Sequence, residues 1–266
     1  MKILFSTGSL YYLPLDDIFQ IAKETGFDGC DVVVNRHLDY RQCREILHEC
    51  SQVLPIYALH VPFLKLPSWG NQVEAIIRSV EVAKDLRIPV VNLHPPSWFH
   101  LEINFLKWFR HVKDFQKELG CEDVALALEN MPLMGKSIKL APYLLNDHTE
   151  ALRFGLARNL HFTFDTTHMA TFDHDIVHAF LEFFRTRRLL HVHLSDYASP
   201  ESHLFVGGGK LPIVRLLNTM RAVGYEGSIS LEVSPTELPF TREWVIRILR
   251  YAASFLKMNV GREING

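Results

Sequence analysis

Two spacings of hydrophobic residues alternate along the chain. In the first, every second residue is apolar: Leu160, Phe162 and Phe164 are separated by His161 and Thr163, which is the side-chain period of a β-strand. In the second, apolar residues recur three or four positions apart, as on one face of an amphipathic helix. The first pattern, together with short continuous apolar runs, predicts strands over residues 3–7, 30–35, 56–62, 90–94, 124–129, 160–165, 189–194 and 228–233. The second predicts helices over residues 14–25, 40–52, 71–86, 103–119, 147–156, 173–185 and 212–222, and a last helix beginning at Thr241 with an apolar face of Trp244, Ile248, Leu249, Ala252, Phe255 and Leu256.

Each predicted strand is followed by a predicted helix, without a linker or a low-complexity break. This regular alternation predicts an α/β fold, a single (β/α)8 TIM barrel that spans residues 1–266 as one domain. A doubly wound open sheet is the alternative. It would not need eight regular units, and no Gly-x-Gly-x-x-Gly follows the first predicted strand. We therefore favour the barrel.

The composition excludes several classes of protein. A hydrophobic fraction of 48% and a charged fraction of 22% are ordinary for a globular protein. The formal net charge of -2 gives no general attraction to nucleic acid or to an anionic membrane, and no apolar run is long enough to span a bilayer. No Cys-x-x-Cys pair occurs, so we interpret the cysteines as reduced thiols of a cytoplasmic protein; they are Cys30, Cys43, Cys50 and Cys121.

The predicted strands carry ionisable residues at their C-terminal ends. Alternate positions such as Leu126 and Leu128, or Phe162 and Phe164, are large and apolar and are expected to face the helices. The opposite positions are small or polar, and the last of them on each strand is expected to point into the mouth of the barrel, where barrel enzymes have their active sites. These residues are His60, His94, Glu129, Asp165, His193 and Glu232.

A divalent cation explains these strand ends best. Burying several ionisable groups together is costly unless they are paired, and a cation would turn three carboxylates and three imidazoles into ligands. Asp165 is also followed by His168, which adds a nitrogen ligand close to an oxygen ligand. The alternative is a set of separately satisfied polar side chains, with Asp165 capping the next helix. His191, on the same strand face as His193, is interpreted as a core histidine or a support for a ligand.

Several short motifs together resemble the xylose isomerase-like barrel superfamily. This superfamily contains sugar and sugar-phosphate isomerases and epimerases, and also the endonuclease IV-type apurinic endonucleases. The resemblance extends from the third predicted strand to the eighth. It is carried by His60-Val-Pro, Asn92-Leu-His94-Pro, Leu128-Glu129-Asn130-Met-Pro, Asp165-Thr-Thr-His168, His193-Leu-Ser-Asp196, Glu201-Ser-His203, Gly207-Gly208-Gly209 and Leu231-Glu232.

The resemblance implies two different sets of metal ligands. In the epimerase branch one ion of Mn, Co or Zn would be held by Glu129, Asp165, His193 and Glu232, and His168 would contact the substrate. In the endonuclease branch three zinc ions would be bound, with additional ligands from His60, His94, His168, Glu201 and His203. Two departures from the pattern stand out: the endonucleases carry an aspartate at the position of Glu201, and both branches usually carry a glutamate at that of Gly208.

We favour an isomerase or epimerase that acts on a small sugar or sugar phosphate through an enediolate. Glu129 and Glu232, on either side of the ion, would remove and return the proton at carbon. The alternative is a metal-dependent phosphodiesterase on abasic DNA, which the nearly complete ligand set favours. Against it, the DNA enzymes that this chain resembles carry longer insertions after the second and seventh strands, and no Lys/Arg stripe with interleaved aromatics is present. A non-catalytic binding barrel ranks last because both glutamates are present. We expect a carbohydrate partner rather than nucleic acid, and leave the oligomeric state open.

Overall fold

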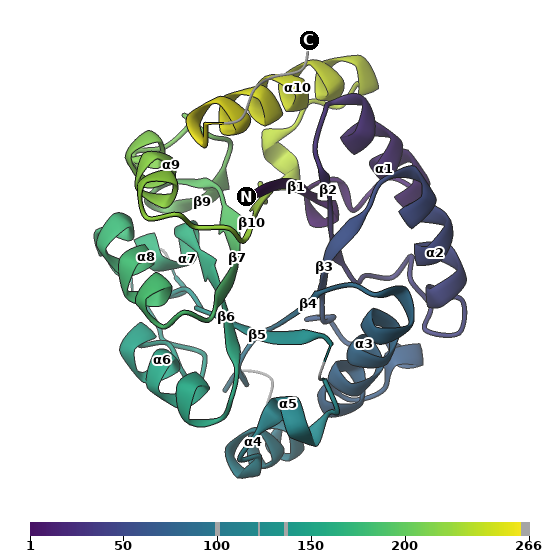
Figure 1. Cartoon of the computed structure of the whole chain (residues 1–266), viewed down its shortest axis with the longest axis vertical. Coiled ribbons are helices and arrows are strands. Elements are labelled where there is room, and N and C mark those ends of the chain that lie inside the picture. Colours follow the sequence, from purple (N-terminus) through teal and green to yellow (C-terminus); the bar gives the residue numbers. More distant parts are fainter. Residues whose placement is uncertain (99–101, 122, 136–137, 262–266) are drawn as a thin grey trace.

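The computed structural model describes residues 1–98, 102–121, 123–135 and 138–261. Parallel strands close into a barrel in the order β1-β10-β7-β6-β5-β4-β3-β2, so that strands β1 to β7 lie side by side in chain order and β10 closes the ring against β1 (Figure 1). The predicted (β/α)8 barrel is confirmed. Its strands are β1 Lys2–Ser6, β2 Gly29–Val33, β3 Ile56–His60, β4 Val90–Leu93, β5 Ala125–Glu129, β6 His161–Asp165, β7 Leu189–Leu194 and β10 Ser228–Leu231.

Helices surround the barrel as an outer ring (Figure 1). They are α1 Leu15–Glu24, α2 Cys43–Val53, α3 Gln72–Leu86, α4 Ile103–His111, α5 Phe115–Glu118, α6 His148–Ala157, α7 Thr166–Ala170, α8 Ile176–Arg185, α9 Ile213–Ala222 and α10 Arg242–Asn259, with 3-10 turns at η1 Thr7–Leu10, η2 Pro67–Trp69 and η3 Pro235–Glu237. Among the described residues, no helix is both long and apolar enough to cross a membrane.

Two apolar layers position the polar residues. The large outward side chains of the strands, Phe162 and Phe164 among them, pack against the helices in the main core. Inside the barrel the apolar residues are smaller: Ala58, Val90 and Ala127 form a separate buried cluster. These small side chains fill part of the lower interior and leave the rest to buried polar residues such as Asp31 and His191. The ionisable side chains at the strand ends lie one step further along, at the C-terminal end of the barrel.

The predicted continuous helix over residues 103–119 was wrong. α4 ends at His111, Val112 is extended (φ −60°, ψ 125°), and α5 begins after Asp114. The Asp114 carboxylate accepts a hydrogen bond from the Lys117 N–H (3.0 Å), which caps a new helix. The apolar spacing continued across the break because Phe109 and Phe115 both reach the same core.

Two further helix predictions need correction. The helix predicted over 173–185 begins at Ile176, after its N-cap Asp175, and the short helix α7 directly after β6 was missed. In α10, Trp244 does not lie on the buried face: it is 51% exposed, with the Arg247 guanidinium 5.0 Å from its ring centre. The buried face begins one residue later, at Val245 and Leu249.

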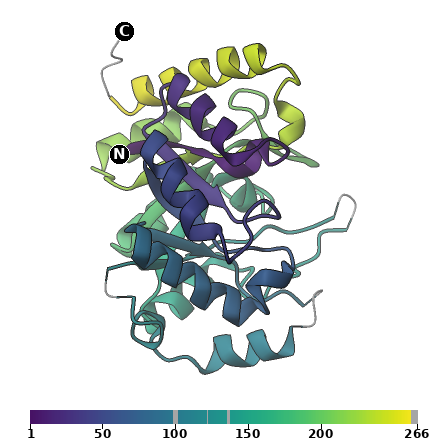
Figure 2. The same ribbon diagram turned by 90° about the vertical axis from the view of Figure 1, so that its right-hand side faces the viewer.

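The mouth of the barrel also carries two extensions that were not predicted. β8 (Asp196–Ala198) and β9 (Glu201–Leu204) form an antiparallel hairpin between β7 and α9. Met134 and Leu140 pair in an isolated bridge within the connection from β5 to α6. This connection extends beyond the barrel at the right of Figure 2. Loops on this side therefore surround the strand ends that carry the ionisable residues.

Candidate metal centre

The ionisable residues predicted at the strand ends lie together at the mouth of the barrel. In the described part of the chain, four groups of His, Asp and Glu side chains have the spacing of metal ligands. The groups share members: Glu129, Asp165 and His193 each belong to two of them. The groups are Glu129, Asp165 and His193; His60, His94 and Glu129; Asp165, His168 and His203; and Asp31, His191 and His193.

His193 is at the centre of the largest concentration of charge, which we call the central site (Glu129, Asp165, His193 and Glu232). The Nδ1 atom of His193 lies 3.0 Å from Glu232 Oε2, 3.3 Å from Glu129 Oε1 and 3.9 Å from Asp165 Oδ2. Glu129 ends β5, Asp165 ends β6, and Glu232 follows β10. Strand ends on both sides of β7, which carries His193, therefore present three carboxylates to one imidazole nitrogen.

The orientation of His193 is set by Asp31, in the middle of β2. His193 Nε2 donates to Asp31 Oδ2 at 3.1 Å, and His191 Nε2 lies 3.2 Å from the same oxygen. All three residues are fully buried. Because the proton of a neutral His193 is then on Nε2, its Nδ1 keeps a lone pair directed at the three carboxylates. Metal-binding histidines in proteins usually have this kind of second partner.

In the second group, His60 and His94, which we call the histidine pair, contact the other carboxylate oxygen of Glu129, Oε2. His60 Nδ1 donates to the Val61 carbonyl oxygen (2.7 Å), which leaves a lone pair on Nε2. The Nε2 atoms of His60 and His94 are 3.1 Å apart, and each is 3.4 Å from Glu129 Oε2. Asn92 also donates to this oxygen (2.6 Å). Glu129 therefore stands between the central site and the histidine pair.

The third group joins Asp165 to His168 in α7 and to His203 in the β8–β9 hairpin. Asp165 Oδ1 accepts the His168 backbone N–H (2.6 Å), so this carboxylate also caps α7. His168 Nδ1 lies 2.9 Å from the Asn130 carbonyl oxygen and 3.1 Å from Glu129 Oε1. The capping role that was the alternative for Asp165 is real, and it leaves Asp165 Oδ2 directed at the central site.

The charges in the central site shift several pKa values strongly. Burial alone would lower the pKa of His193, but Glu232 and Glu129 raise it well above its ordinary value. Burial would raise the pKa of Glu232, but His193 lowers it to about 2. Burial would lower the pKa of His168, but Asp165 and Glu129 raise it to about 9. The carboxylates thus stabilise positive charge at this point of the barrel.

The residues present fit a divalent cation. His193 Nδ1 and Asp165 Oδ2 are buried and make no hydrogen bond of standard geometry among the described residues, although carboxylate oxygens lie 3.0 to 3.9 Å from His193 Nδ1. Buried polar atoms in such an arrangement favour a bound ion. Imidazole nitrogen and carboxylate oxygen are the donors that Zn²⁺, Mn²⁺ and related ions accept. Glu129, Asp165, His193 and Glu232 would hold such an ion, and the two neighbouring groups offer places for others.

Not every predicted ligand is brought to the site, and some supporting residues were missed. Glu201 lies exposed on β9 and belongs to none of the groups found in the described residues. Asp31 was missed, although an aspartate inside the apolar run of β2 was a visible signal. The sequence motif contains Asn130 but did not reveal its supporting role. Its side chain donates to the Asp165 carbonyl oxygen (3.0 Å) and accepts from the Asp165 N–H (2.8 Å), which joins the ends of β5 and β6.

A cluster of potential metal ligands thus lies at the mouth of a (β/α)8 barrel. Residues 19–251 match the xylose isomerase-like TIM barrel family, so the chain belongs to that family. Among curated proteins it is 27% identical to an uncharacterized protein of Mycobacterium leprae (96% of this chain, 98% of the other) and 24% identical to an uncharacterized protein of Methanocaldococcus jannaschii (87% and 84%).

Solved structures with the same fold include enzymes of both branches. A D-tagatose 3-epimerase-like protein is similar with a TM-score of 0.72 and 22% identity (98% of this chain, 100% of the other). The D-allulose 3-epimerase of a Methylomonas species, in complex with D-allulose, has a TM-score of 0.67 and 15% identity (97% and 97%). Endonuclease IV from Thermus thermophilus has a TM-score of 0.62 and 15% identity (96% and 100%). At these identities the similarity shows the fold.

Proposed function

We propose that the protein is a divalent-metal-dependent isomerase or epimerase that acts on a small sugar or sugar phosphate through an enediolate. The observation that carries the proposal is the pair of glutamates on the central histidine. Glu129 Oε1 and Glu232 Oε2 lie 3.3 and 3.0 Å from His193 Nδ1, and they come from strands that β6 and β7 separate. The solved epimerases with this fold, one of them bound to D-allulose, support the same assignment.

The two glutamates would divide the proton transfer between them. When bound, the divalent ion would polarise a carbonyl group of the sugar and so make the neighbouring C–H more acidic. A carboxylate on one side of the substrate removes the proton from carbon, and the carboxylate on the other side returns a proton. In the ion-free protein, Asp165 and Glu129 raise the pKa of His168 to about 9 against the effect of burial. His168 lies beside the central site and would contact a substrate oxygen there.

The test replaces each carboxylate by its amide. Glu129→Gln and Glu232→Gln keep the side-chain shape but remove the base, so each should lose at least about 100-fold in turnover. Glu243→Gln, on the exposed side of α10, is the matched control and should keep full activity. The wild-type protein loaded with Mn²⁺, Co²⁺ or Zn²⁺ should exchange a substrate proton at carbon with deuterium from the solvent. The absence of exchange across a broad panel of ketoses and their phosphates would reject the proposal.

The second candidate is an endonuclease IV-type phosphodiesterase on abasic DNA. It is favoured by one observation, the presence of ligand groups on both sides of the central site: His60 and His94 at Glu129 Oε2, and His168 and His203 at Asp165. Metal analysis decides between the candidates together with a nicking assay. Three ions per chain, with cleavage of an abasic duplex by the wild type and not by Glu129→Gln, would assign the phosphodiesterase activity. One tightly bound ion without nicking would leave the isomerase.

A further inference from the structure

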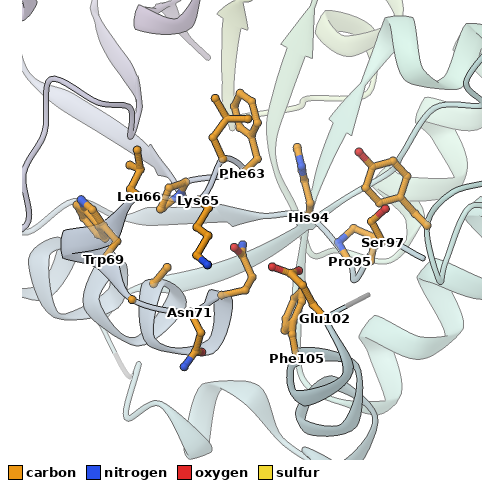
Figure 3. A pocket seen from close by; sticks show the side chains of 16 residues that line it. Phe63, Lys65, Leu66, Trp69, Asn71, His94, Pro95, Ser97, Glu102 and Phe105 are labelled. Carbon is orange, nitrogen blue, oxygen red and sulfur yellow. The ribbon is translucent and has the colours of Figure 1, made fainter. Parts of the chain in front are cut away.

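A cavity of about 500 Å³ lies beside the candidate metal centre. It is lined by residues between Pro62 and Gln72, from the connection between β3 and α3, and by Pro95, Ser97, Glu102 and Phe105 from the described residues around the start of α4. His94, one of the histidine pair, is part of its lining. Figure 3 shows the lining side chains around this space, which we call the side cleft. The cavity and the candidate metal centre therefore adjoin at His94.

The apolar walls of the side cleft are already in place. They are formed by Phe63, Leu66, Trp69, Phe105 and Tyr143. The Trp69 indole N–H donates to the Leu38 carbonyl oxygen (2.7 Å), which fixes the ring. The Phe63 ring stacks on His94, with ring centres 5.9 Å apart and an angle of 27° between the planes. Trp69 and Phe105 are almost completely buried, so they support the lining, and the aromatic surface open to a ligand comes from Phe63 and Tyr143. Aromatic surface of this kind suits a ring-shaped ligand.

The polar groups of the side cleft are balanced in charge. Lys65 and Glu102 reach into it from its two sides (Figure 3). Asn71 uses its side-chain oxygen to cap α3 through the Val73 and Glu74 N–H groups, so its amide NH2 remains as a donor. One cation opposite one carboxylate gives no excess positive charge for a phosphate or a nucleic acid backbone. Hydrogen-bond donors beside aromatic side chains, here the Lys65 ammonium and the Asn71 amide, instead suit hydroxyl groups on a ring.

From this arrangement we infer that the side cleft is a subsite for a second, uncharged sugar ring, joined by a glycosidic bond to the sugar at the metal centre. The inference rests on the proposed isomerase or epimerase function and narrows its substrate class to disaccharides and other glycosides. The ring in the side cleft takes no part in the proton transfer. Its contacts contribute to binding and to the choice of substrate.

The test fills the side cleft and compares two classes of sugar. Gln72 lines the cleft at the first turn of α3 and is half-buried, so Gln72→Trp should occupy its volume. Ile77→Trp, on the exposed side of the same helix and outside the cleft lining, is the matched control. Calorimetric titration of the Mn²⁺-loaded wild type with a panel of reducing disaccharides, and with their component monosaccharides, measures the preference directly.

We expect at least one disaccharide to bind about 10-fold or more tightly than either of its component monosaccharides. Gln72→Trp should abolish this preference while monosaccharide affinity and metal content stay unchanged, and Ile77→Trp should retain it. Equal affinities in the wild type, or a preference that survives Gln72→Trp, would overturn the inference and leave the proposed function intact. Binding of no sugar at all, together with no deuterium exchange, would reject the proposed function itself.

Discussion

Asp31 provides a direct test of how the central site is built. In Asp31→Asn, one carboxylate oxygen that accepts from both His193 Nε2 (3.1 Å) and His191 Nε2 (3.2 Å) becomes part of an amide. The amide keeps one oxygen that can accept, but the negative charge that strengthens both bonds and favours a proton on His193 Nε2 is lost. His193 is then free to carry its proton on Nδ1, the atom that faces Glu129 and Glu232. A proton there occupies the position of the cation.

The expected loss follows from the role of such supporting residues. Removing a partner that orients a metal-binding histidine typically weakens metal binding about 10- to 100-fold, or roughly 1.4–2.7 kcal/mol. Competition titration of Zn²⁺ or Mn²⁺ against a chromophoric chelator measures this affinity without any assumption about the reaction. Long-range ¹H–¹⁵N NMR correlation spectra of the imidazoles report which nitrogen of His193 carries the proton.

Ser228 supplies the matched control. It contacts the same buried group from the other side, because His191 Nδ1 lies 2.7 Å from Ser228 Oγ, while His193 is not among its hydrogen-bond partners. Ser228→Ala should therefore leave metal affinity within about 2-fold of the wild type, as expected for a residue that does not touch the ligand. If Asp31→Asn binds the ion as tightly as Ser228→Ala and keeps Nδ1 of His193 unprotonated, Asp31 does not orient the ligand and the reasoning fails.

Two further predictions concern pH and thiol reactivity. Since a cation displaces protons, and Asp165 and Glu129 raise the pKa of His168 to about 9 against the lowering effect of burial, the thermal stabilisation by Mn²⁺ should be larger near pH 8 than near pH 6. In the ion-free protein, the raised pKa of His168 contributes folding stability that is complete below pH 6.5 and is lost as the pH rises through 9, so the proton competes more strongly with the cation at the lower pH. A Mn²⁺-induced rise in Tm that is larger at pH 6 than at pH 8 would contradict this prediction. Burial raises the pKa of Cys43 to about 12 and that of Cys50 and Cys121 to about 11, so a disulfide reagent should label these thiols slowly in the native protein and quickly in guanidinium chloride. Fast stoichiometric labelling of these three thiols in the native protein would contradict the prediction that burial protects them.

Most of the barrel could be predicted because strands and helices have different apolar periods. Phe162 and Phe164 identify both the strand and its helix-facing side, and they are buried as that alternation predicts. The same signal could not detect the break between α4 and α5, because Phe109 and Phe115 lie on one apolar face on both sides of it. Nor could it place Trp244, since a difference of one residue on a helix rotates a side chain by about 100°.

The candidate site could be predicted where the strand register alone determines it. Glu129 and Asp165 are the last residues of their strands, so alternation is sufficient to point them into the mouth. His203 belongs instead to the β8–β9 hairpin, whose position depends on tertiary contacts. Asp31 lies one step deeper than the strand ends. Its role depends on β7, which is not adjacent to β2 in the sheet and contacts it only across the interior of the closed barrel.

The closed barrel is therefore part of the chemistry of the site. Asp31 on β2 reaches His193 on β7 through the interior, and Glu232 after β10 reaches the same imidazole from the neighbouring strand end. Glu129 approaches from β5. An open sheet would leave β2 and β7 far apart, and His193 would lose the partner that keeps Nδ1 available. The small residues Ala58 and Ala127 leave room for this layer of polar side chains above them. A cation at the centre would then balance carboxylates that the fold has already removed from water, which couples metal binding to the stability of the barrel mouth.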